Sequence, residues 1–394
     1  MSPRLETRGA SGSTTRRYRA FLAVVIAGAM ACAGDGHLVL DPLSGDPAHF
    51  TWTLPAGFAP PPVPISNPMS AAKVELGRRL FYDTRLSGNR AFACSSCHRQ
   101  EFAFSDAKNI PLGSTGQAHT RNSMGLTNVA YQRNFGWAGP ATISLETQAL
   151  IPELGEVPVE LGIKDRETEV LTRLRAEPVY QSLFPKSFGA TPDPFTLANV
   201  NRAIAAFERI LVSGNAPIDR FNRGDTLALS AAARRGRGVF NNLRCTRCHG
   251  GRDFSIAFEP GTPVGDEFVN TGLYNIGGTG AYPTRNGGLF ETTHAPADMG
   301  RMKIPTLRNV AVSFPYGHDG SVGSLEDVID NYARGGRLIT VGPNAGDGQL
   351  NPFKDRRISA FSITPQGRAD LVAFLQALTD SSFLTDRRFS NPWR

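Results

Sequence analysis

Cys94-Ser95-Ser96-Cys97-His98 decides how this chain is built, and Cys245-Thr246-Arg247-Cys248-His249 repeats its pattern in the second half. Each stretch is a C-x-x-C-H motif, and the two motifs use four of the five cysteines in 394 residues. In such a motif the two thiols bond the vinyl groups of a haem, and the histidine ligates its iron. A structural zinc site needs four ligands where each motif offers three, and paired disulfides would leave both histidines without a role. The sequence therefore predicts two covalently bound c-type haems.

The composition is that of a globular protein, with 40% hydrophobic and 20% charged residues. A chain of this length has room for about two or three domains. Its 41 glycines and 28 prolines indicate helices joined by long structured loops. Much of the formal net charge of +7 comes from the arginines of residues 1–31, so no nucleic-acid partner is expected.

Residues 1–31 have the pattern of an export signal. A basic segment ending in Arg16-Arg17-Tyr18-Arg19 precedes the apolar run Ala20–Ala31, which is too short to span a bilayer stably. Ala29-Met30-Ala31 fits cleavage just before Cys32, although Cys32 could instead be a lipidated first residue. We expect an exported, periplasmic protein that is anchored to a membrane only if Cys32 is lipidated.

The expected fold is mainly α, with two cytochrome c-like haem domains and long structured loops. A helix should begin after Pro68-Met69-Ser70, and its Gly77-x-x-x-Phe81 pattern recurs as Gly236-x-x-x-Phe240 before the second motif. Further helices are expected over Phe195–Ser213, from Ser324 and from Thr364-Pro365. The expected segments are a signal peptide (1–31), an extended lead-in (32–66), an N-terminal haem domain (67–213), a C-terminal haem domain (214–380) and a C-terminal tail (381–394).

Further motifs surround the two haem motifs. They include Leu80-Phe81-Tyr82-Asp83, Arg85-Leu86-Ser87-Gly88, Leu126-Thr127-Asn128, Leu145-Glu146-x-Gln148-Ala149, Pro158-Val159-Glu160, Ile304-Pro305-Thr306-Leu307-Arg308-Asn309-Val310 and Pro315-Tyr316-x-His318-Asp319-Gly320. With them the chain resembles the bacterial dihaem cytochrome c peroxidase and MauG superfamily over roughly residues 67–380. Its finer details are most similar to the MbnH branch.

That resemblance implies an enzyme that uses hydrogen peroxide. It implies oxidation of a tryptophan to kynurenine on a small exported partner, an MbnP-like copper-binding protein, through a high-valent dihaem state. The first haem, on His98, would be the peroxidatic one, with Gln148 and Glu160 over its open face. Because Glu160 lies two residues farther from Gln148 than is usual, Glu156 is a possible substitute.

Other roles implied by the resemblance concern the region between the haems. Trp137 matches a tryptophan that shortens the electron path between them. Asn122 matches a calcium ligand, joined by the carbonyl oxygens of Ser313 and Pro315, and calcium prefers such oxygen donors. Ser313 stands where threonine is usual.

Tyr332 is implied as the axial ligand of the second haem, at a position where peroxidases carry methionine and MauG carries tyrosine. Leu325, Val328, Ile329 and Tyr332 share one helical face, which a core tyrosine would share as well. Thioether ligation raises a haem potential and suits an electron relay. A phenolate favours higher oxidation states, so the second haem would share the oxidising equivalents of peroxide.

Two residues limit the resemblance. His119 lies in the loop that carries a distal ligand in reductively activated peroxidases, but its spacing differs, and we expect a flexible-loop residue. Leu243 replaces a surface tryptophan of MauG, so a path to a protein substrate must start elsewhere; Trp393 is a speculative candidate. Two other functions remain open, a dihaem peroxidase fed by a small redox protein and a dihaem electron carrier.

Overall fold

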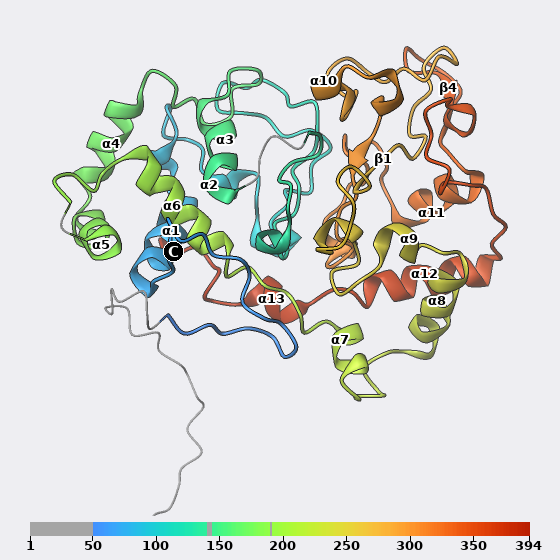
Figure 1. The fold of residues 1–394 in the computed structure, drawn as a ribbon, viewed down its shortest axis with the longest axis horizontal. Helices are drawn as coiled ribbons and strands as arrows, with labels where there is room; N and C mark the ends of the chain where they lie inside the picture. The colour runs from blue at the N-terminus through green and yellow to red at the C-terminus, as the bar shows by residue number, and fades with distance from the viewer. Residues whose placement is uncertain (1–49, 140–143, 190) are drawn as a thin grey trace, which may run out of the picture. The chain divides into compact units, whose positions relative to one another are not determined.

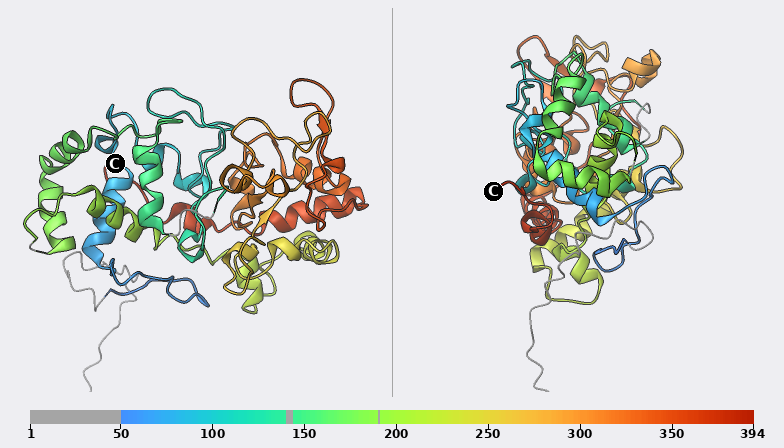
Figure 2. Two further views of the ribbon diagram at one scale, coloured as in Figure 1. Left: turned by 45° about the horizontal axis from the view of Figure 1, so that its top comes forward. Right: turned by 90° about the vertical axis from the view of Figure 1, so that its left-hand side faces the viewer.

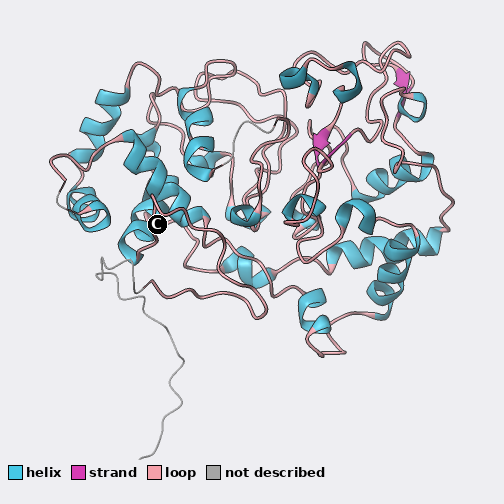
Figure 3. Ribbon diagram, in the orientation of Figure 1, coloured by secondary structure: helices cyan, strands magenta, loops and turns pink. Residues whose placement is uncertain are grey.

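The structure is a computed structural model that describes residues 50–139, 144–189 and 191–394, all within one unit of the fold. Helices and long loops dominate and the strands are very short, which confirms the mainly α class (Figure 3). The expected signal peptide (1–31) and Cys32 lie outside the described residues. No helix in the described part of the chain is long and apolar enough to cross a membrane.

The elements follow one another along the chain as labelled in Figure 1. The α-helices are α1 (Ala71–Phe81), α2 (Leu145–Gln148), α3 (Leu150–Leu154), α4 (Glu167–Arg175), α5 (Pro178–Phe188), α6 (Leu197–Glu208), α7 (Pro217–Asn222), α8 (Ala231–Asn242), α9 (Thr246–His249), α10 (Phe290–Thr293), α11 (Leu325–Arg334), α12 (Pro365–Gln376) and α13 (Ser381–Thr385). Antiparallel strands β1 (Phe268–Val269) and β2 (Met302–Lys303) pair Phe268 with Lys303, and β3 (Leu338–Ile339) and β4 (Gly346–Asp347) pair Leu338 with Asp347. Short 3₁₀ turns cover Thr84–Leu86, Cys94–Ser96, Gln100–Phe102, Val129–Tyr131, Ile256–Phe258, Pro296–Asp298, Val310–Val312 and Gly348–Leu350.

Helices α1 and α6 form the frame of the N-terminal half. The predicted start of α1 is confirmed, because the Ser70 side chain accepts a hydrogen bond from the Lys73 N–H. The helix expected over Phe195–Ser213 is shorter, since the Thr196 side chain caps it and it ends at Glu208. Beyond that point the backbone turns aside, and the Leu211 carbonyl accepts from the Asn128 N–H instead of continuing the helix.

Helices α8 and α12 form the equivalent frame of the C-terminal half and lie side by side in Figure 1 and in the left-hand view of Figure 2. Ser230 caps α8 and Thr364 caps α12, which confirms the start predicted at Thr364-Pro365. Phe240 on α8 packs against Phe374 on α12, with ring centroids 5.2 Å apart. In each half, the haem motif therefore follows the first helix of a crossed pair, and the second helix comes later in the sequence.

The glycines of the repeated Gly-x-x-x-Phe pattern lie at these two crossings. A Cβ on Gly77 would stand 1.8 Å from the Ala203 carbonyl oxygen of α6, and one on Gly236 would stand 1.8 Å from the Asp370 carbonyl oxygen of α12. No side chain fits at such a distance from a backbone atom. The repeat thus has a packing cause, because glycine lets the two helix backbones touch.

The last residues of the chain return to the N-terminal half, where the C-terminus lies near α1 (Figure 1). Phe383 and Phe389 are fully buried in the same core as Phe81 and Phe104. The Phe389 carbonyl accepts a hydrogen bond of 2.7 Å from the Tyr82 hydroxyl. Residues 381–394, expected as a tail, thus complete the first core.

A buried polar network links the segments that meet near Gly214. Asn128 accepts from the Ser213 N–H at 2.7 Å, and Asn309 donates to the Ser213 hydroxyl at 3.1 Å. Asp380 accepts from the Gly214 N–H at 3.0 Å, and its own N–H donates to Asn309 at 2.8 Å. Both asparagines adopt left-handed backbone conformations (φ 57° and 61°), which asparagine tolerates better than most residues. The network joins residues from both halves of the sequence.

We expect Gly236→Ala and Gly238→Ala to change stability in opposite directions. The first places a methyl group against the backbone of α12, and such overpacking costs about 1–3 kcal/mol or more. The second adds a methyl group where nothing lies within 4 Å, and alanine stabilises a helix interior by roughly 0.5–1 kcal/mol relative to glycine. Thermal unfolding of the two haem-loaded variants beside the wild type measures the contrast. A Gly236→Ala protein as stable as Gly238→Ala would contradict the close crossing.

Candidate functional site

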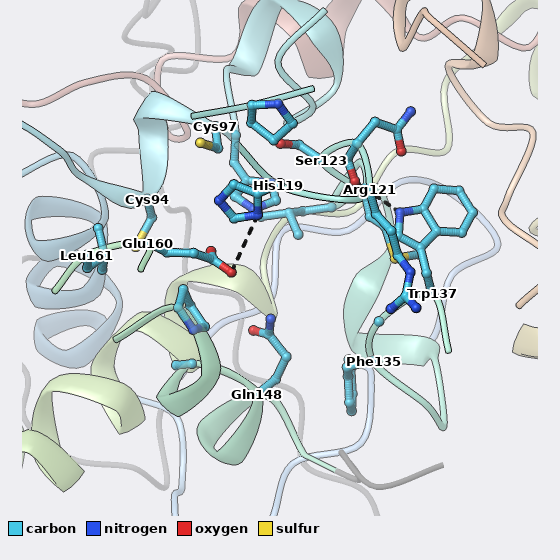
Figure 4. A pocket seen from close by; sticks show the side chains of 18 of the residues that line it. Cys94, Cys97, His119, Arg121, Ser123, Phe135, Trp137, Gln148, Glu160 and Leu161 are labelled. Atoms are coloured by element: carbon cyan, nitrogen blue, oxygen red, sulfur yellow. Dashed lines mark hydrogen bonds and ion pairs between the residues drawn. The ribbon is translucent and has the colours of Figure 1, made fainter. Parts of the chain in front are cut away.

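Two cavities lie against the two C-x-x-C-H motifs. The first, of about 500 Å³, is lined by Cys94 and Cys97, which are labelled in Figure 4, and by His98. The second, of about 580 Å³, is lined by Cys245, Cys248 and His249. Both volumes fall in the range of about 300–1,000 Å³ that is usual for ligand and cofactor pockets. The four thiols are free rather than joined in disulfides, so each pair is available for a thioether bond.

The motif histidines are oriented for ligation through Nε2. The Nδ1–H of His98 donates to the Phe104 carbonyl at 2.8 Å, and that of His249 donates to the Phe254 carbonyl at 3.2 Å. Burial lowers the pKa of His98 and lowers that of His249 to about 4. Both rings are therefore neutral at pH 7, with an Nε2 lone pair left for a metal. Thiol pairs, neutral histidines and cavities together fit a c-type haem at each motif.

Two of the residues expected over the first haem line the first cavity. Gln148 comes from the end of α2, and Glu160 comes from the loop after α3 (Figure 4). Glu160 is partly buried, and burial raises its pKa to about 7. Glu156, the alternative, is exposed and forms an ion pair of 2.5 Å with Lys164 outside the cavity. The geometry favours Glu160 as the carboxyl that reaches the cavity.

His119 does not behave as the expected flexible-loop residue. Its ring lines the first cavity, and its Nδ1 lies 3.8 Å from a Glu160 carboxyl oxygen. The His119 Nε2 is buried, and no described residue forms a hydrogen bond with it. The loop expectation is wrong in one respect, because contacts with distant segments turn the ring inward.

Trp137 lines both cavities, as its expected bridging position requires. Its indole N–H donates to the Asn122 carbonyl at 3.0 Å, and its own carbonyl accepts from the Lys303 N–H at 2.8 Å. The indole also approaches His318 edge-on, with ring centroids 6.5 Å apart. These contacts fix the indole in the partition between the two cavities.

Asn122, Ser313 and Pro315 all line the second cavity. The Asn122 Nδ2 donates to the Pro315 carbonyl at 3.0 Å, while its Oδ1 is buried with no partner among the described residues. An unpaired amide oxygen beside backbone carbonyls suits a hard cation such as calcium. The described residues contain no cluster of three or more His, Cys, Asp or Glu able to hold a metal, so any cation here would rely on neutral oxygens.

Tyr332 lines the second cavity from α11, whose predicted capping residue Ser324 is confirmed. The ring, like Cys248, packs against a small apolar cluster of Val269, Ile304 and Ile358, and Leu325, on the same helical face, lines the cavity as well. The hydroxyl has no hydrogen-bond partner in the described part of the chain. Burial raises the pKa of Tyr332, so a phenolate there needs a cation beside it.

Of the two residues considered for an electron path to the surface, Leu243 lines a cavity and Trp393 does not. Leu243 lines the second cavity, where MauG was expected to carry tryptophan. Trp393 packs against Tyr180 and beneath Arg85 in the N-terminal half, with its indole N–H donating to the Arg79 carbonyl. It lines neither cavity and is a packing residue.

Sequence reasoning missed three buried charged residues in the cavity walls. Burial raises the pKa of Glu153 and of Glu208 to about 8, so both are largely protonated at pH 7. Burial lowers the pKa of Lys303 to about 7, and this residue lines both cavities. A signal existed for Glu208, because it lies four residues after Ile204 on the apolar face of its helix. Lys303 has no comparable local signal.

Comparison with known proteins agrees with this geometry. The family model of the di-haem cytochrome c peroxidases matches residues 71–227. The cytochrome-c peroxidase IdrP1 of Denitromonas iodatirespirans is 36% identical over 343 residues, 82% of this chain and 86% of that protein. The methylamine utilization protein MauG of Methylorubrum extorquens is 33% identical over 366 residues, 91% of this chain and 93% of that protein.

Solved structures give the same result. The crystal structure of a MauG-like protein associated with microbial copper homeostasis aligns with a TM-score of 0.84 at 43% identity, over 88% of this chain and 100% of that one. The dihaem peroxidase BthA from Burkholderia thailandensis aligns with a TM-score of 0.60 at 18% identity, over 88% of this chain and 92% of that one, and shows the fold alone. Through its two haem motifs, its cavities and these relatives, the chain belongs to the dihaem cytochrome c peroxidase and MauG family of enzymes.

Proposed function

We propose that this enzyme uses hydrogen peroxide to oxidise a tryptophan on a small exported, copper-binding partner protein to kynurenine. The observation that carries the proposal is Tyr332 in the wall of the cavity that holds His249. The similarity to a MauG-like protein associated with copper homeostasis supports the class of partner. Oxidation of an indole to N-formylkynurenine adds two oxygen atoms, which two peroxide molecules supply as they become water, and hydrolysis then releases formate and leaves kynurenine.

In this proposal the two motifs hold two haems, which supply the redox chemistry of peroxide reduction. Glu160 holds a proton at its carboxyl and delivers it to the leaving oxygen, since burial keeps the acid form populated near pH 7. Gln148 orients peroxide through its amide. Trp137 provides the aromatic link in the partition, and Tyr332 closes the second cavity toward His249.

The remaining expectations stay proposals as well. Calcium would bind at Asn122, Ser313 and Pro315, where the amide oxygen of Asn122 has no hydrogen-bond partner among the described residues. The enzyme would work in the periplasm, exported by a signal peptide at 1–31 and lipid-anchored only if Cys32 is modified. The boundary between the two haem domains would lie near Gly214, where the chain passes through the buried polar network.

A second candidate is a peroxidase that takes electrons from a small redox protein. The relative IdrP1, which is named as a cytochrome-c peroxidase, favours it. Tyr332 opposes it, because an electron-relay haem is better served by a thioether ligand that raises its potential. The variants below separate the two candidates.

Exchange of Tyr332 tests the ligand directly. We expect the wild-type ferric protein to show one high-spin and one low-spin haem and to form a long-lived oxidised state with stoichiometric peroxide. Tyr332→Met should keep both haems but lose that state, because a thioether disfavours higher oxidation states. Absorption and electron paramagnetic resonance spectra follow both properties. Tyr131→Phe, outside both cavities, is the control, and an unchanged Tyr332→Met protein would disprove the ligation.

Exchange of Glu160 tests the acid. Glu160→Gln should slow the reaction with peroxide by about 10²–10⁴-fold, the usual contribution of a general acid or base. Because the acid form is required and its pKa is about 7, the wild-type rate should fall as pH rises through 7. Stopped-flow absorption measures both. Glu156→Gln should react at the wild-type rate, and the reverse order of the two variants would assign the role to Glu156.

A further inference from the structure

His119 and Glu160 face each other across the wall of the first cavity (Figure 4). The distance of 3.8 Å between His119 Nδ1 and a Glu160 carboxyl oxygen is too long for a direct hydrogen bond. It is short enough for both groups to contact the same small substrate molecule. The second ring nitrogen of His119 is buried and has no partner among the described residues. We propose that His119 is a second catalytic residue, which acts as the base while Glu160 acts as the acid in the reaction with peroxide. This inference rests on the proposed peroxide chemistry of the first cavity.

Contacts between two segments far apart in the sequence hold the pair together. The Ser114 N–H donates to the Glu160 carbonyl at 2.8 Å, and the Val159 N–H donates to the Gln117 side chain at 2.9 Å. A Cβ on Gly113 would stand 1.8 Å from the Val159 carbonyl oxygen, so the two backbones touch. The His119 N–H donates to the Pro111 carbonyl at 3.0 Å and closes the loop. The ring of His119 is thereby fixed beside Glu160.

The protonation states of the two residues suit Glu160 to the role of acid and His119 to the role of base. Burial raises the pKa of Glu160 to about 7 and lowers that of His119 below its usual 6.5. Near neutral pH the pair therefore holds one exchangeable proton on Glu160, while His119 is neutral and free to accept another. A lone carboxyl would have to lose its proton before it could act as a base. The pair offers both functions at once.

The proton transfers balance without an outside donor. As the O–O bond breaks, the proton of one peroxide oxygen passes to His119, and the Glu160 proton passes to the other oxygen, which leaves as water. The haems, when bound, would supply the two electrons for this cleavage and would retain the deprotonated oxygen, which is the atom later transferred to the substrate. The remaining imidazolium and carboxylate then exchange a proton, which restores neutral His119 and protonated Glu160.

Other charged groups around the pair shift its protonation without reversing it. Asp106 raises the pKa of His119 and His98 lowers it, but burial is the larger effect. Further ionisable residues in the wall of the cavity are Arg121, Glu153, Glu208, Arg285, Glu291 and Lys303. Glu153 and Glu208 are largely protonated at pH 7, and Arg121 forms an ion pair of 2.7 Å with Glu291.

Haem-loaded His119→Gln tests the inference, because glutamine keeps a polar side chain but accepts no proton at these pH values. We expect its bimolecular reaction with peroxide to slow by about 10²–10⁴-fold. The wild-type rate should fall on both sides of its optimum, above pH 7 as Glu160 ionises and at acidic pH as His119 becomes protonated. His119→Gln should lose the acidic fall and keep the alkaline one. His294→Gln, an exposed histidine outside the cavity, is the control and should match the wild type.

The spin state of the ferric protein provides a readout apart from activity. With His119 acting as a base, the first haem should be high-spin in the wild type and remain so in His119→Gln. A low-spin first haem that turns high-spin in the variant would make His119 an iron ligand and overturn the inference. So would an unchanged rate and pH profile. Should the variant bind no haem, His119→Ala measured with and without added 2-methylimidazole replaces it, and recovery of the rate is then expected. A wild-type protein inert to peroxide would instead defeat the proposed function itself.

Discussion

The buried hydrogen-bond network around Ser213 is the constraint on which the rest of the structure depends. Asn128 precedes the tryptophan of the partition, Asn309 follows β2, and Asp380 caps the start of α13, yet all three meet at one chain crossing. Leaving one such buried polar group without a partner costs about 1–3 kcal/mol. Because the network ties both halves together beside the partition, it fixes the relative position of the two cavities that Trp137 lines.

The two halves repeat one plan at several levels. A capped helix crosses a second helix at a glycine, a haem motif follows, and a phenylalanine carbonyl then orients the motif histidine. Differences in the loops make the halves unequal. The first cavity receives Gln148, Glu160 and His119, whereas the second receives Tyr332. The repeated helical frame forms two similar haem-motif cavities, and the loops give each cavity a different chemical environment.

Sequence patterns predicted what depends on local physics and missed what depends on distant contacts. The caps at Ser70, Ser324 and Thr364 follow from short-range hydrogen bonds, so they could be read directly. The end of α6 could not, since a remote asparagine draws the backbone away after Glu208. The inward orientation of His119 depends on contacts of its loop with Val159 and Glu160, some forty residues later, and no local sequence pattern predicts it.

The return of the chain end to the first core has a consequence for how the protein is made. Phe383 and Phe389 are integral to the core that Cys94 borders. A chain synthesised from its N-terminus cannot complete that core until its last residues are available. The first haem motif therefore borders a core that stays incomplete until Phe383 and Phe389 have joined it.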